Sequence, residues 1–213
     1  MDASKSLLLQ VPFYRQASQF TCGPASLMMA LKFFQPSIHL NRGLELDIWR
    51  ESNLVESYGT SKERLAVAAV KRGFSAYTMG VSRRHSFVDE IADKIPNVDK
   101  EVLELLYNDI KMKFRSMGLN NLNRTIVLPV LKTILKRSHV PILLTSTSLF
   151  GEKEALPHWV TLTGYSEDAW YVNNPLAKSP NTPVDQARLA HSLGYQGVQC
   201  AVVVRGVTKR RKS

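Results

Sequence analysis

Cysteine is scarce in this sequence. Its 213 residues include only two, Cys22 and Cys200. Two cysteines cannot form the disulfide framework of a small secreted domain, and no CxxC pair suggests a structural zinc site. Such cysteine usage suits a reducing compartment, so we expect a cytoplasmic protein.

Long apolar runs are also missing. No segment approaches the roughly 20 consecutive apolar residues that span a bilayer, and the apolar stretch at residues 7–9 is too short for the core of a signal peptide. The sequence contains no GxxxxGK[ST] loop for nucleotide phosphates. We therefore expect a soluble protein with no membrane partner.

Basic residues are in excess, but half of the excess lies at one end. The chain has 28 basic and 18 acidic residues, a formal net charge of +10. Residues 205–213 hold five basic residues and no acidic one. This distribution argues against a nucleic-acid-binding surface and indicates a solvated basic tail at 208–213, with a localisation or docking signal as the alternative. At this length, residues 1–207 are expected to form one domain.

Helical patterns dominate the first two thirds of the chain. Residues 7–14 alternate loosely and predict a strand. Pro24 suits the first turn of a helix, and apolar residues from Leu27 to Phe34 predict that this helix is buried on nearly every side. The segment 41–137 is mostly helical in pattern. Within it we expect a helix opened by a capping box at Thr60–Glu63, a short strand at 74–79, and helices at 99–117 and from 128 onwards.

The last third is rich in short β-type runs. They lie at residues 140–146, 159–165, 169–173 and 199–205, separated by Gly, Pro, Asn and Ser. We predict that these runs form an antiparallel sheet. Helices followed by strands in a chain of this length indicate an α+β architecture.

Cys22 stands at the entry of the predicted buried helix. Unpaired N–H groups and the dipole at a helix start stabilise a thiolate, the nucleophilic form of cysteine. A catalytic cysteine also needs a base, and His158 is the best placed of the five histidines because it follows Pro157 at the head of the strand 159–165. We therefore predict Cys22 as nucleophile and His158 as general base. Cys200 is expected to be a buried small hydrophobic residue.

The runs 159–165 and 169–173 predict a hairpin. With its turn centred on Glu167, His158 lies opposite position 176, so Asn174 shares its face of the sheet and Asn173 faces away. An amide oxygen there can accept a hydrogen bond from one ring nitrogen and turn the other towards sulfur. We therefore predict that Asn174 orients His158.

These residues resemble a known family. The string Gln16-x5-Cys22-Gly-Pro-Ala-Ser-Leu, the later Pro157-His158-Trp-Val-x-Leu-x-Gly-Tyr and the pair Asn174-Pro175 are similar to the bacteriocin-processing (double-glycine) cysteine peptidases and their stand-alone soluble relatives, within the papain-like superfamily. The resemblance covers roughly residues 12–34 and 140–175. It implies a papain-like fold with a buried N-terminal catalytic helix, a helical middle segment and a C-terminal antiparallel sheet.

The resemblance also implies roles. Gln16 would donate a hydrogen bond to the oxyanion. Gln19 is the alternative donor, and only the spacing to Cys22 and the family pattern favour Gln16 over it. The implied activity is that of a cysteine peptidase or amidase, acting on a peptide or protein through a Cys22 thioester, with no metal and no cofactor. Two alternatives use the same residues: an acyltransferase of the transglutaminase or phytochelatin-synthase kind, and a catalytically silent peptide-binding module of the same fold.

Two features depart from the family pattern. Such peptidases usually carry Asp where this sequence has Asn174. Their transporter-linked members are fused to a membrane exporter, which has no counterpart in this sequence. Leader-peptide export is therefore not expected.

Overall fold

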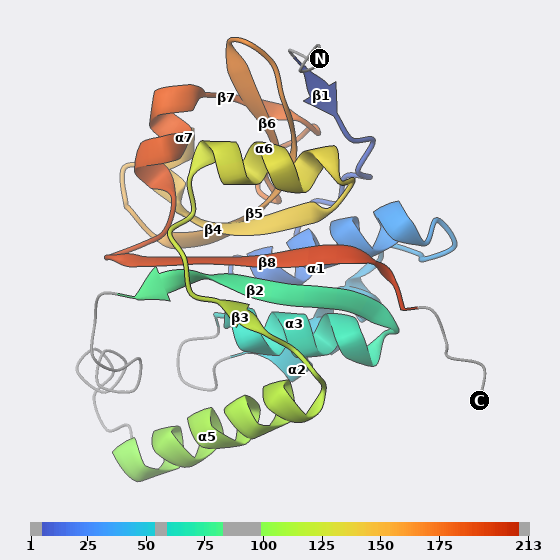
Figure 1. The fold of residues 1–213 in the computed structure, drawn as a ribbon, viewed down its shortest axis with the longest axis vertical. Helices are drawn as coiled ribbons and strands as arrows, with labels where there is room; N and C mark the ends of the chain where they lie inside the picture. Colours follow the sequence, from blue (N-terminus) through green and yellow to red (C-terminus); the bar gives the residue numbers. More distant parts are fainter. Residues whose placement is uncertain (1–5, 54–58, 83–98, 209–213) are drawn as a thin grey trace.

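A computed structural model describes residues 6–53, 59–82 and 99–208. It is built on one eight-stranded sheet in the order β3-β2-β8-β4-β5-β6-β7, with β1 paired to β5 (Figure 1). The strands are β1 (Leu7–Leu8), β2 (Phe74–Ser82), β3 (Asn121–Leu122), β4 (Val140–Ser146), β5 (Pro157–Tyr165), β6 (Ala169–Asn173), β7 (Thr182–Asp185) and β8 (Val198–Val207).

The predicted antiparallel sheet is confirmed. All neighbouring strands pair antiparallel except β2 and β3, which pair in parallel over two residues. β4 and β6 have the predicted bounds, while β5 begins two residues early and β8 is longer at both ends. β2 is longer than the short strand expected there, because it pairs with β8 along its whole length.

Helices cover both faces of this sheet. The described helices are α1 (Cys22–Phe34), α2 (Arg42–Ser52), α3 (Lys62–Lys71), α5 (Lys100–Ser116), α6 (Leu128–Lys136) and α7 (Gln186–Ser192), with a 3-10 turn, η1 (Thr147–Phe150). α6 packs against β4 and β5 and is drawn above them in Figure 1, whereas α1 passes behind β8. The predicted α+β class is confirmed. Within the described ranges, no helix has the length and apolar character needed to cross a membrane.

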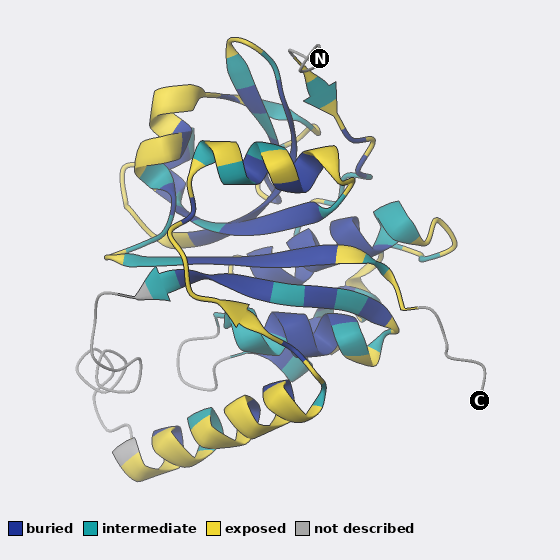
Figure 2. Cartoon of the chain, in the orientation of Figure 1, coloured by how far each residue is buried: buried dark blue, intermediate teal, exposed yellow. Residues whose placement is uncertain are grey.

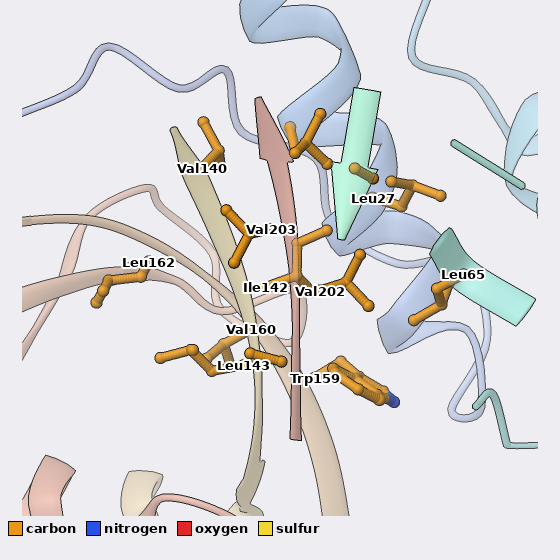
Figure 3. Packing of buried hydrophobic residues seen from close by; sticks show 14 of the residues in the cluster. Leu27, Leu65, Val140, Ile142, Leu143, Trp159, Val160, Leu162, Val202 and Val203 are labelled. Carbon is orange, nitrogen blue, oxygen red and sulfur yellow. The ribbon is translucent and has the colours of Figure 1, made fainter. Parts of the chain in front are cut away.

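The hydrophobic core lies on both faces of the sheet, with α1 and α3 on one face and α6 and α7 contributing on the other. In Figure 3, Leu27 of α1 and Leu65 of α3 lie on the side of β8 to which Val202 points, whereas Val203 points to the other side. Helix α1 is buried at every residue from Cys22 to Leu31, while α5 is largely exposed (Figure 2). The buried N-terminal helix is therefore confirmed, and its burial holds the start of α1 firmly against the sheet.

The strand predicted at residues 7–14 is wrong beyond its first two residues. Only Leu7 and Leu8 pair with β5, and the Leu9 N–H still reaches the Thr163 carbonyl at 2.8 Å. Past this point the chain leaves the sheet, and Pro12 has no N–H to donate to a ladder. The residues after Leu9 instead continue into the loop that precedes α1.

The N-terminus of α3 lies one residue later than the predicted capping box. Ser61 is the N-cap, and its side chain accepts a hydrogen bond from the Arg64 N–H at 3.2 Å. Thr60 is turned inward and is buried. At the other end of the chain, Thr208 is the only residue of the predicted tail within the described residues, and its N–H bonds to the Gly73 carbonyl at 2.7 Å.

Candidate active site

Cys22 is the first residue of α1 and is 8% exposed. The side chain of the preceding Thr21 does not cap the helix; its hydroxyl donates instead to the Ser18 carbonyl at 2.9 Å. The first N–H groups of a helix have no partner within it, so the missing cap leaves them for other acceptors. Backbone hydrogen bonds from Cys22 and Gly23 act on the thiol and favour its ionised form.

The start of α1 is fastened to β5 by side chains. The Ser26 hydroxyl donates to the Trp159 carbonyl at 3.2 Å, and the Thr161 hydroxyl donates to the Ser26 carbonyl at 3.0 Å. The backbone of Trp159 also makes a hydrogen bond with the Cys22 thiol. Cys22 is therefore held against the residue that directly follows His158.

Gly23 lies in close contact with the Thr60 side chain. A Cβ on Gly23 would collide with the Thr60 hydroxyl oxygen. The Thr60 carbonyl in turn accepts a hydrogen bond from the Trp159 indole at 3.2 Å. The glycine after the cysteine therefore allows the residues before α3 to approach the helix start closely.

His158 and Asn174 form a buried pair. The distance between His158 Nε2 and Asn174 Oδ1 is 2.8 Å, and the two residues are 2% and 5% exposed. The ring of Phe150 packs edge-on against the imidazole, with 5.9 Å between centroids. Because an amide oxygen only accepts, Nε2 carries the proton of the neutral ring and Nδ1 is left as the basic nitrogen.

The hairpin register explains why Asn174 rather than Asn173 meets the histidine. Thr161 lies opposite Asn173 in the β5–β6 pair, which places Asn174 one residue beyond the paired region. The Asn173 side chain is used elsewhere: its Nδ2 donates to the Val11 carbonyl at 3.1 Å and its Oδ1 accepts from the Asn181 N–H at 2.9 Å. Asn173 therefore ties loops together and faces away from His158, as the alternation along the strand predicts.

Gln16 reaches the same region from the loop before α1. Its backbone N–H donates to the Pro175 carbonyl at 3.0 Å, which joins this loop to the residue after Asn174. Its side-chain Nε2 donates to the Ser18 carbonyl. An amide nitrogen has two hydrogens, so this bond leaves one for another acceptor. Gln19, the alternative donor, is exposed.

The ionisation of the pair differs from the expectation drawn from the sequence. Burial raises the pKa of the Cys22 thiol, and the hydrogen bonds from Trp159, Gly23 and Cys22 itself oppose this only in part. Burial likewise lowers the pKa of His158 against the opposing effect of Asn174. Both shifts favour the neutral thiol and the neutral imidazole, whereas the helix start alone favours the thiolate.

The Cys22 thiol lies beside the backbone of Trp159, the residue after His158, but it is not hydrogen-bonded to the imidazole. Within the described residues, no hydrogen bond joins the Cys22 sulfur to the His158 ring. Catalytic hydrogen bonds are often long in a ligand-free site and shorten when substrate binds.

The other cysteine, Cys200, is buried in β8, where burial raises its pKa to about 12. The described residues contain no group of three His, Cys, Asp or Glu side chains placed to hold a metal ion.

Residues 11–194 match the model of a family described as Peptidase_C39-like. The chain belongs to this family. The matched range includes Gln16, Cys22, His158 and Asn174. No curated protein matches the sequence.

Two solved structures show that the chain has the fold of C39-like peptidases. A protein from Bacillus anthracis described as a C39-like peptidase aligns with a TM-score of 0.57 and 15% identity, over 96% of this chain and 99% of that one. The peptidase domain of Streptococcus ComA, a bi-functional ABC transporter involved in a quorum-sensing pathway, aligns with a TM-score of 0.50 and 14% identity, over 93% of this chain and 99% of that domain. The match to the family model confirms the predicted family resemblance, and these structures agree with it in fold.

The side chains that hold the candidate site together could not be recognised from the sequence. Ser26 and Thr161 dock α1 on β5, and the buried Glu45 of α2 accepts hydrogen bonds from the loop that carries Gln16. Ser26 is one small residue within a buried helix, and a glutamate in the first turn of a helix is common on protein surfaces. Only the residues that they contact in the folded protein distinguish Ser26 and Glu45 from other serines and glutamates in helices.

Proposed function

We propose that this C39-like protein is a cysteine peptidase or amidase acting on a peptide or protein. The observation that carries the proposal is the buried His158–Asn174 pair, placed one residue from the strand position that contacts Cys22. This is the pairing that fixes the ring of a catalytic histidine. Membership of the family supports the same conclusion.

In the proposed reaction, His158 Nδ1 takes the Cys22 proton as the sulfur attacks a carbonyl carbon. The negative oxygen that results is stabilised by the Cys22 N–H and by the second N–H of the Gln16 amide. The tetrahedral intermediate collapses, the amine leaves with a proton from His158, and a thioester remains on Cys22. Water, deprotonated by the same imidazole, then releases the acid and restores the thiol.

The neutral resting pair fits this order of events. A thiol that keeps its proton until a carbonyl is in place needs the base at the moment of attack, so Asn174 must hold His158 in one orientation throughout.

A free thiol must also escape oxidation, and we propose a reducing, cytoplasmic location for that reason.

The test is mass spectrometry of a cellular peptide pool incubated with the wild-type protein and with Cys22→Ala. A hydrolase produces new peptide termini only with the wild type. An acyltransferase produces peptides joined to amines instead. A pool left unchanged by both proteins contradicts catalysis and favours a binding module.

A further inference from the structure

Glu45 is the most deeply buried acidic side chain near the site, and the reaction described above does not use it. It is 0% exposed and lies in the first turn of α2. A buried carboxylate is costly unless hydrogen bonds satisfy it. The partners that satisfy Glu45 therefore identify what it holds in place.

Among the described residues, both side-chain hydrogen-bond partners of Glu45 come from the loop that carries Gln16. The Tyr14 hydroxyl donates to Glu45 Oε2 at 2.9 Å, and the Ala17 N–H donates to Oε1 at 2.9 Å. Each carboxylate oxygen thus accepts from a residue on a different side of Gln16. Burial and Glu45 together raise the pKa of Tyr14 to about 12, so its hydroxyl remains a donor at neutral pH.

The carboxylate is also well placed electrostatically. The N-cap Asn41 opens α2 by accepting from the Leu44 N–H at 3.0 Å, and the Glu45 N–H follows with a bond to the Asn41 carbonyl at 3.1 Å. A negative charge in the first turn interacts favourably with the helix dipole. The helix start and the two hydrogen bonds together let the charge remain buried.

The loop is held from its other side by the strand hairpin, through the Gln16 N–H and the Pro175 carbonyl. Gln16 therefore lies between two fixed points, Glu45 on α2 and the turn after Asn174. An oxyanion donor contributes only when it is already aimed at the position where charge develops. A loop anchored at one end alone would leave the amide free to move.

We propose that Glu45 is a positioning residue, which holds the loop at Tyr14 and Ala17 so that the Gln16 amide faces the oxyanion. The proposal rests on the peptidase function proposed above. Glu45 touches neither the substrate nor the reacting atoms. Its effect is exerted through the orientation of Gln16.

Two reactions of Cys22 separate this role from a general effect on folding. With p-nitrophenyl acetate, the sulfur bonds to the carbonyl carbon, His158 takes the thiol proton and p-nitrophenolate leaves, so an oxyanion forms on the way. With iodoacetamide, the sulfur displaces iodide directly and no oxyanion forms. The ratio of the acylation rate to the alkylation rate therefore reports on the oxyanion donors while accounting for changes in the thiol itself.

The decisive variant is Glu45→Met, which keeps a long side chain but leaves the Tyr14 hydroxyl and the Ala17 N–H without their acceptor. We expect its acylation-to-alkylation ratio to fall by about 10-fold or more, since small displacements of a positioned group cost up to about 100-fold. In Glu45→Gln the amide oxygen still accepts from Ala17, though less strongly than a carboxylate, so we expect a loss of about 3-fold.

The matched control is Glu51→Met. Glu51 lies on the same helix but pairs with Arg72 at 3.0 Å and Lys71 at 3.5 Å, away from the Gln16 loop. We expect it to keep the wild-type ratio even where it lowers the thermal midpoint. Thermal unfolding of each variant confirms that it is folded, and if Glu45→Met does not fold, Glu45→Gln decides the question.

The outcomes distinguish the two proposals. If p-nitrophenyl acetate acylates the wild-type protein no faster than Cys22→Ala, the proposed function is overturned. The proposed role of Glu45 then falls as well. If the wild-type protein is acylated at Cys22 but the folded Glu45 variants keep the wild-type ratio of acylation to alkylation, only the role of Glu45 is overturned. A ratio that falls equally in Glu51→Met also overturns it.

Discussion

Replacing Asn174 with alanine removes the only side-chain hydrogen bond of the His158 ring in the described structure. The lost contact is the 2.8 Å bond to Nε2, in a place where His158 is 2% exposed and water cannot readily substitute. A buried donor left unpaired costs about 1–3 kcal/mol, which corresponds to a rate loss of about 5- to 150-fold if the cost falls on the productive orientation of the ring. We expect the acylation of Cys22 by p-nitrophenyl acetate to slow by that factor in Asn174→Ala.

The aspartate variant supplies the matched comparison. Asn174→Asp keeps an oxygen acceptor for both Nε2 and the Leu176 N–H, so most of the activity should remain. Its added negative charge also raises the pKa of His158, whereas burial lowers it in the wild type. A base acts only when deprotonated, so the acid limb of the pH–rate profile should shift to higher pH in Asn174→Asp.

Asn173 provides the control for position. Asn173→Ala removes the bonds to Val11 and Asn181, so we expect lower thermal stability with a near-normal acylation rate per folded molecule. The assay follows p-nitrophenolate release, with Cys22→Ala as background. A fully active Asn174→Ala beside a folded but inactive Asn173→Ala would refute the assigned orientation of His158.

Three further predictions concern the other side chains of the site. Gln16→Ala should slow acylation by about 100-fold while leaving alkylation nearly unchanged, whereas Gln19→Ala should do much less; reversed effects would move the oxyanion donor to Gln19. The rate at which iodoacetamide alkylates Cys22 should still increase as the pH rises past about 8.5, because burial raises the pKa of the Cys22 thiol. A rate that is already constant from mildly acidic pH upwards would instead indicate a resting thiolate. Cys200, which is also buried, should react only after unfolding. Gly23→Ala should lower both the thermal midpoint and acylation, because its Cβ collides with a neighbouring side chain, and a variant identical to the wild type would show that the contact yields at no cost.

Local patterns predicted the fold where strands are consecutive. β5 and β6 are joined by a short turn, but the pairs next to it, such as Tyr165 with Trp170, are one residue away from the register predicted from a turn centred on Glu167. A β-bulge between Leu162 and Gly164 shifts the pairing by one residue, so that Thr161 lies opposite Asn173 as predicted and Asn174 meets His158. The failed strand at residues 7–14 shows the limit of the same reasoning. Whether a loosely alternating segment pairs depends on its tertiary neighbours, and here Asn173 takes up the Val11 carbonyl in place of a strand.

The supports of the site could not be predicted, because each joins residues far apart in sequence. Ser26 and Thr161 meet only once α1 lies on β5, and Glu45 meets Tyr14 only once α2 packs behind the loop. The ionisation of Cys22 was predicted in the wrong direction for a related reason. The helix start was visible in the sequence, but the degree of burial, which outweighs it, was not.

The central claim is that Cys22 forms an acyl-enzyme with the help of His158. Intact-protein mass spectrometry after brief exposure to p-nitrophenyl acetate, followed by peptide mapping, tests it most directly. The account predicts one acetyl group on Cys22 in the wild-type protein, lost again with time as water hydrolyses the thioester, and little or none in His158→Ala. Acetylation spread over lysines with Cys22 unmodified, or equal labelling of Cys22 in the wild type and His158→Ala, would contradict it.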